Sequence, residues 1–167
     1  ADGNGNDAER VLRERMAKAP KDAQAVRLLV TVLRSMDRDQ EALSLVKEIA
    51  ATEGTEAAGQ YLLGSLYFSD QDYDKAIEAF KLSLDLSPAS REPLQGLVAA
   101  LVRNDRANEA EALLTDFTNR YPNNLLAKTL LGQLLAGQGD AVAAEALLES
   151  TLESDESWLP GYTALAG

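Results

Sequence analysis

The sequence contains neither cysteine nor histidine, and only 5% of its 167 residues are aromatic. Without these side chains it can form no disulfide, no zinc site with cysteine or histidine ligands, no thiol nucleophile and no serine–histidine–aspartate triad. No run of eighteen apolar residues occurs, so we expect no membrane insertion of this segment. The lack of cysteine is compatible with oxidising and reducing compartments alike. Localisation is therefore open between a bacterial periplasm or cell envelope and the cytoplasm.

Basic residues are also scarce, because 16 lysines and arginines stand against 27 aspartates and glutamates, which gives a net charge of −11. Nucleic acids and anionic membranes attract basic surfaces. The composition therefore argues against a nucleic-acid partner. Hydrophobic residues make up 46% of the chain, and alanine and leucine are abundant among them. This composition predicts a folded chain that is rich in helix.

An internal repeat of 34 residues runs through the chain without an insertion. Its full units are residues 23–56, 57–90, 91–124 and 125–158. A repeat of this length indicates an array of helix pairs, because one pair cannot bury both of its faces alone. Two columns of the repeat are invariant: Ala42, Ala76, Ala110 and Ala144 at the twentieth position, and Leu29, Leu63, Leu97 and Leu131 at the seventh.

Within the unit 57–90, apolar residues at spacings of three and four predict two helices that are joined by a polar turn. Asp72 lies where it can cap the second helix. Gly64 is small enough to let the paired helices approach closely. Val30 and Val98 occupy the same position in two other units, so we expect wider or shifted helix pairs there.

On these columns the chain resembles tetratricopeptide repeat (TPR) proteins, whose unit also spans 34 residues. The resemblance covers residues 8–167 and implies an all-α fold, a right-handed α–α superhelix or solenoid. It implies about four full helix-turn-helix repeats, with a half-repeat at residues 7–22 and a partial repeat at 159–167. We expect residues 1–6 to be a disordered polar tail. Because half-repeats stand at both ends, we also expect a segment of a longer bacterial TPR array.

In proteins of this family the first helices of the repeats line a concave groove that binds peptides or partner helices. The resemblance therefore implies a non-catalytic scaffold for protein–protein interaction, without a cofactor. Arg27 and Arg34 lie two turns apart on one helix face, and Tyr61 and Phe68 repeat this spacing one unit later. A basic strip beside an aromatic strip suits a peptide with acidic and apolar side chains; an ordinary surface without a ligand is the alternative. The expected groove residues are Arg27, Thr31, Arg34, Tyr61, Ser65, Phe68, Gln95, Arg103 and Gln133.

Two acidic stretches, residues 2–7 and 70–75, do not meet the requirements of a calcium-binding EF-hand loop. Such a loop needs glycine at its sixth position and glutamate at its twelfth. Paired carboxylates elsewhere fall on the polar faces of the expected helices, where solvent screens them. We therefore predict neither catalytic nor metal-binding residues.

The Ala- and Leu-rich units resemble those of bacterial arrays in envelope machines for assembly or export, which suggests a similar setting for the scaffold. Two alternatives for the function stay open from the sequence. An array of this kind can be structural and self-associating, through an apolar C-terminal end made of Trp158, Leu159, Tyr162 and Leu165. A polysaccharide-binding part of an export system is the second alternative, with Tyr61 and Phe68 as stacking platforms for sugar rings.

Overall fold

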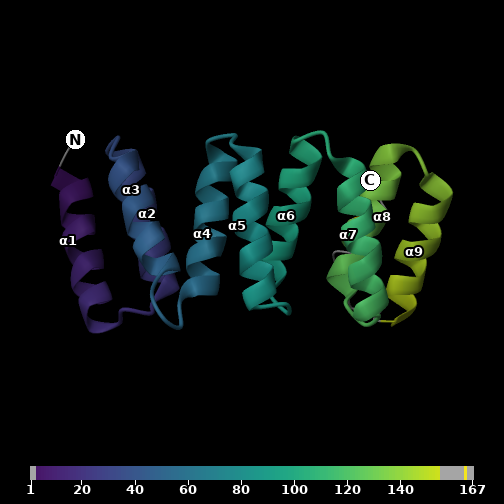
Figure 1. The fold of residues 1–167 in the computed structure, drawn as a ribbon, viewed down its shortest axis with the longest axis horizontal. Coiled ribbons are helices and arrows are strands. Elements are labelled where there is room, and N and C mark those ends of the chain that lie inside the picture. The colour runs from purple at the N-terminus through teal and green to yellow at the C-terminus, as the bar shows by residue number, and fades with distance from the viewer. Residues whose placement is uncertain (1–2, 155–163, 165–167) are drawn as a thin grey trace. The chain divides into compact units, whose positions relative to one another are not determined.

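The computed structural model describes residues 3–154 and residue 164. Within these residues every regular element is an α-helix, and none of the helices is long and apolar enough to cross a membrane (Figure 1). The helices are α1 (Gly3–Lys18), α2 (Ala23–Ser35), α3 (Asp39–Ala50), α4 (Glu56–Ser69), α5 (Tyr73–Leu86), α6 (Arg91–Arg103), α7 (Ala107–Arg120), α8 (Leu125–Gln138) and α9 (Ala141–Ser154).

The helices follow the period of the sequence. The second helices of the four repeats, α3, α5, α7 and α9, begin at residues 39, 73, 107 and 141, at equal intervals of 34 residues. Each second helix packs against the first helix of its own repeat or of the next one, as α3 does against both α2 and α4. Residues 155–158, and residues 159–167 apart from residue 164, lie outside the described residues, as do Trp158, Leu159, Tyr162 and Leu165 of the expected apolar end.

Helix α1 starts earlier than the sequence suggested. The disordered tail predicted for residues 1–6 is wrong for residues 3–6, which form the first turn of α1; residues 1–2 are outside the described residues. The backbone of Gly5 runs close to Met36, because a methyl group added at Gly5 would lie 2.7 Å from the Met36 sulfur. The absence of a side chain at Gly5 therefore lets this polar turn of α1 lie close to Met36.

The chain divides into two compact units, residues 1–96 and residues 97–167. In the first unit α2 contributes one apolar stripe, with Leu29 and Leu33 completely buried at a spacing of four residues. Val46 of α3 is also completely buried in the same cluster. Partly buried Leu12 and Met16 of α1 pack against it, so the half-repeat covers one side of this core.

The second unit has a core of the same kind. Leu97 and Leu114 are completely buried, and α8 packs against both α7 and α9. A methyl group at Gly132 of α8 would lie 2.7 Å from Leu148 of α9, so only glycine permits this approach of the two helices. The alanine column of the repeat is buried throughout the chain: Ala42, Ala76, Ala110 and Ala144.

Phe80 of α5 fills the space that two glycines leave open. A methyl group at Gly64 of α4 or at Gly96 of α6 would lie 2.6 Å from the Phe80 ring. The α4–α5 hairpin, which has Gly64, packs more extensively than the α2–α3 hairpin, which has Val30 at that position. This difference is the one expected from the size of the two residues.

An ion-pair network attaches α1 to the turn between α2 and α3. The Arg38 guanidinium binds the carboxylates of Glu9 in α1 and Glu41 in α3, and Arg13 donates to Glu9 at 2.8 Å. The hydrogen bonds from Arg38, followed by those from Arg13, lower the pKa of Glu9 below its usual value. Arg38 likewise lowers the pKa of Glu41. The network therefore favours the charged form of both carboxylates in the folded protein.

Candidate functional site

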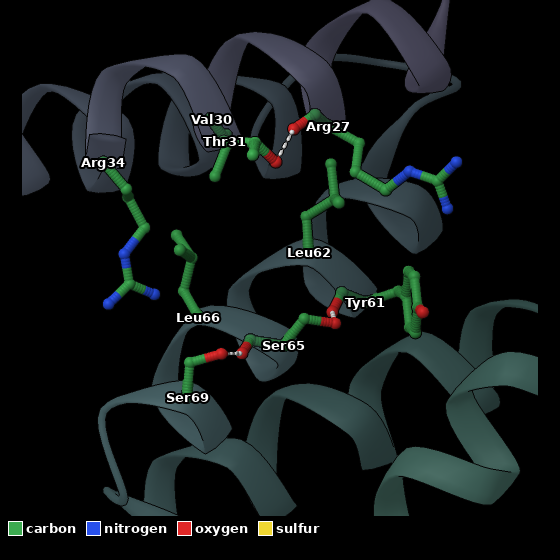
Figure 2. Close-up of a pocket in the computed structure, with 9 residues that line it drawn as sticks. All are labelled: Arg27, Val30, Thr31, Arg34, Tyr61, Leu62, Ser65, Leu66 and Ser69. Carbon is green, nitrogen blue, oxygen red and sulfur yellow. Dashed lines mark hydrogen bonds between the residues drawn. The ribbon is translucent and has the colours of Figure 1, made fainter. Parts of the chain in front are cut away.

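An open groove of about 310 Å³ lies between the first helices of two successive repeats, α2 and α4, in the first unit (Figure 2). We call it the α2–α4 groove. Arg27 and Tyr61 stand at one end of it, and Arg34 and Ser69 at the other. The groove is lined by Arg27, Val30, Thr31 and Arg34 of α2 and by Tyr61, Leu62, Ser65, Leu66 and Ser69 of α4.

Helical spacing explains why these residues meet. On α4, Tyr61, Ser65 and Ser69 recur every four residues and form one line along the helix. On α2, Arg27, Thr31 and Arg34 form the corresponding line, beside the stripe that α2 buries in the core. The two polar lines face each other across the groove.

The floor of the groove is aliphatic. Val30, Leu62 and Leu66 leave 8%, 6% and 8% of their surfaces exposed, and all three line the groove. They belong to the core cluster of the first unit, so they are held in place by packing from below. A side chain that is placed on this floor would bury apolar surface without any rearrangement of the protein.

The threonine and serine hydroxyl groups in the groove donate hydrogen bonds to carbonyl oxygens of their own helices. Thr31 donates to the carbonyl oxygen of Arg27 at 3.0 Å, Ser65 to that of Tyr61 at 2.9 Å and Ser69 to that of Ser65 at 3.0 Å. A hydroxyl that donates to its own helix keeps only lone pairs for a ligand. The two lines therefore offer hydrogen-bond acceptors to the groove.

The two arginines of the groove differ in their surroundings. Arg34 donates to Asp39 at 3.0 Å and to Asp70, just after α4, at 2.6 Å. Arg27 is exposed, and among the described residues no ion pair or side-chain hydrogen bond engages its guanidinium. The sequence treated both arginines as equivalent ligand-binding groups, whereas the structure leaves only Arg27 available.

The two aromatic residues expected in the groove are also separated. Tyr61 lines the groove, and its ring packs on Phe80 with a centroid distance of 6.0 Å. Phe68 is not among the lining residues, because its ring packs against Tyr73 at the start of α5, with centroids 5.5 Å apart. The aromatic strip expected from the sequence is therefore reduced to Tyr61 in this groove.

The remaining expected residues do not line the α2–α4 groove. Gln95 is exposed on α6, whereas Arg103 and Gln133 are exposed in the second unit, on α6 and α8. Their expected role in binding stays a prediction that applies to other parts of the array.

Sequence reasoning missed the floor residues Val30, Leu62 and Leu66. The floor residues were missed because an apolar residue at helical spacing is ordinarily assigned to the core. Their position in the sequence could have indicated this role, since each of them is next to an expected groove residue. Asp70 was missed as well, since its pairing with Arg34 depends on two side chains 36 residues apart.

Two family models, each described as Tetratricopeptide repeat, match the chain at residues 67–134 and 40–91. Their matches together span residues 40–134. No curated protein matches the sequence at a significant level.

Solved structures of TPR proteins are similar to this one. The thermophilic TPR protein TTC0263 of Thermus thermophilus has a TM-score of 0.68 at 16% identity, over 98% of this chain and 90% of that one. MamA of Desulfovibrio magneticus RS-1 has a TM-score of 0.63 at 15% identity, over 94% and 89%. YrrB, described as a TPR protein with an unusual peptide-binding site, has a TM-score of 0.57 at 18% identity, over 92% and 79%. Identities this low show the fold alone, and they confirm the predicted class, an all-α TPR superhelix.

Proposed function

Because this chain belongs to the tetratricopeptide repeat family, we propose that it is a non-catalytic scaffold, which binds a peptide or a partner helix of another protein in the α2–α4 groove. One observation carries this proposal. The groove has an aliphatic floor, and its walls contain five of the residues that the family resemblance implies: Arg27, Thr31, Arg34, Tyr61 and Ser65. Ligand sites in proteins commonly combine an apolar surface with a few polar groups that fix orientation.

The likeness to YrrB supports the same reading of the groove, since that protein is described by its peptide-binding site. A role in a bacterial envelope machine for assembly or export is a finer part of the proposal and rests on the composition of the units alone. The polysaccharide alternative needs Tyr61 and Phe68 as a joint platform, and Phe68 packs against Tyr73 instead. The geometry of the groove therefore favours a peptide over a sugar chain.

Blocking the groove tests the proposal. Thr31 is exposed in the groove wall, so Thr31→Trp fills the space without changing the core. Peptides selected from a random display library on the native protein should bind this variant about tenfold more weakly or worse, because the indole occupies their site. Binding is measured by fluorescence anisotropy of the labelled peptides, after circular dichroism has established that the variant folds.

Thr115→Trp is the matched control, because Thr115 is exposed on α7 and does not line the groove. This variant should bind the selected peptides like the native protein. Equal binding to all three proteins would place the peptides elsewhere and overturn the proposed site.

A further inference from the structure

We propose, on the basis of this function, that the α2–α4 groove selects an extended peptide segment with opposite charges at its two ends. In this arrangement a carboxylate of the peptide binds Arg27, an apolar side chain lies on the floor, and a lysine or arginine lies at the end where Asp39 and Asp70 surround Arg34.

The first end is positive. Arg27 is exposed, and no described residue compensates its charge through an ion pair. A guanidinium can bind a carboxylate through two parallel hydrogen bonds, which makes it a specific partner for aspartate or glutamate. Tyr61 stands at the same end and presents a flat ring beside this charge (Figure 2).

The second end is negative. Arg34 contributes one positive charge there, and the carboxylates of Asp39 and Asp70 contribute two negative charges within hydrogen-bond distance of it. A second carboxylate of a ligand would therefore meet a net negative charge and an arginine that is already bound. A basic side chain is attracted to the same place.

The distance between the two ends sets the spacing of the charges in the ligand. Arg27 and Arg34 are seven residues apart on one helix, which corresponds to a rise of about 10 Å. An extended peptide covers this distance with about three residues, at roughly 3.3–3.6 Å each. Because successive side chains of an extended chain point to opposite sides, the acidic, apolar and basic side chains can face the groove together only at alternate positions. The two charges should therefore be four positions apart, about 13 Å, with the apolar residue midway, a span that the long side chains of arginine and lysine can accommodate.

The walls of the groove suit the backbone of such a peptide. The hydroxyl groups of Thr31, Ser65 and Ser69 donate to helix carbonyls, and the lone pairs of their oxygens are available to accept hydrogen bonds. The backbone N–H groups of an extended peptide are unpaired donors. These groups can bond to the hydroxyl oxygens in either direction of the chain.

Synthetic peptides of eight residues test this inference. Each peptide is acetylated and amidated at its ends, to remove terminal charges, and carries one leucine midway between two test positions that are four residues apart. The test positions hold glutamate and lysine, glutamine and lysine, or two glutamates, and the first pair is made in both orders. Binding to the full chain is followed by NMR shifts of the amides of α2 and α4, up to millimolar peptide.

The glutamate–lysine peptide should bind most tightly, in at least one of its two orders. Replacing its glutamate by glutamine should weaken binding about threefold, as expected for an exposed ion pair, and two glutamates should weaken it further. Arg27→Gln should abolish the preference for glutamate over glutamine. Asp70→Asn should reduce the preference for lysine, because it removes the excess negative charge at that end. Arg10→Gln is the charge-matched control, since Arg10 is exposed on α1 and outside the groove.

The outcomes separate this inference from the function on which it rests. If the peptides bind in the groove, so that Thr31→Trp blocks them, but all charge patterns bind equally, the inference is wrong and the proposed function stands. If Arg27→Gln and Arg10→Gln change the preference by the same amount, the effect comes from net charge and the inference is again overturned. If no peptide binds, or if Thr31→Trp has no effect, both proposals fail.

Discussion

Gln71 stands in a backbone conformation that glycine favours, with a φ of 61° in the turn between α4 and α5. The equivalent position in the other three repeats is also left-handed: φ is 57° at Asp37, 57° at Asp105 and 93° at Gly139. The turn therefore requires a positive φ in every repeat, and only the fourth repeat supplies glycine. A side chain in this region crowds the following carbonyl group, at a cost of roughly 1–2 kcal/mol.

We expect Gln71→Gly to stabilise the protein. Relief of the left-handed strain exceeds the extra entropy that glycine has in the unfolded chain, so the free energy of unfolding should rise by about 0.5–1 kcal/mol. Urea denaturation followed by circular dichroism measures the change. Gln133→Gly, in the middle of α8 and also exposed, should instead destabilise by about 1 kcal/mol. A loss of stability in both variants would contradict this account of the turn.

At the scale of the element, the second helices of the four repeats differ in how their N-termini are capped. The side chains of Asp72 and Asp140 accept a hydrogen bond from a backbone N–H in the first turns of α5 and α9. Arg38 and Arg106 stand at the same place before α3 and α7, and neither makes a side-chain capping bond. Each of these arginines binds a glutamate three residues later instead. The second helices are therefore started in two different ways in alternate repeats.

Asn124 caps the first helix α8, and its removal should weaken the second unit. Its side-chain oxygen accepts from the Ala127 N–H at 2.9 Å, so Asn124→Ala leaves that donor without its partner. We expect a loss of about 1 kcal/mol in the free energy of unfolding, measured by urea denaturation. Asn123→Ala, at the exposed neighbouring residue, should change it little. An equal effect of both variants would rule out capping as the cause.

The sequence predicted the elements well, because the interactions that define them recur locally. The alanine column and the cap at Asp72 depend on residues within one repeat, and the structure contains both. Arg27, Thr31 and Tyr61 were expected in a groove from the family resemblance, and all three line the α2–α4 groove, while their role in binding stays a prediction. The pairing of Arg34 with Asp70 could not be predicted, since it depends on the register of two helices and on side-chain rotamers. The position of the Phe68 ring could not be predicted either, since it could lie in the groove or pack against Tyr73, as it does in the structure.

At the scale of the whole molecule, the network around Arg38 makes stability depend on pH. Glu9 has a pKa below its usual value of 4.5 in the folded protein, mainly through its hydrogen bond from Arg38. The unfolded chain therefore takes up the proton first as pH falls. The stabilisation is complete well above about pH 4.5 and is lost as the pH falls from there through the lowered pKa.

Glu9→Gln should make unfolding less dependent on pH in this range. The variant should be less stable than the native protein at about pH 7, and the difference should shrink towards about pH 3, because the native glutamate then becomes protonated as well. Thermal unfolding followed at several pH values measures this. Glu14→Gln is the control, because among the described residues Glu14 forms an ion pair only with exposed Arg10 of the same helix; this variant should keep the pH profile of the native protein. Parallel profiles for native protein and Glu9→Gln would show that Glu9 contributes nothing to acid unfolding.

Phe80 has a consequence for how the first unit melts. Its ring touches the surface left bare by Gly64 in its own repeat and by Gly96 in the next, so one side chain completes two neighbouring interiors. Part of the folding free energy is therefore shared between adjacent repeats and belongs to neither alone. Unfolding of one of these repeats exposes the Phe80 ring and destabilises the other repeat, so the two repeats should unfold cooperatively.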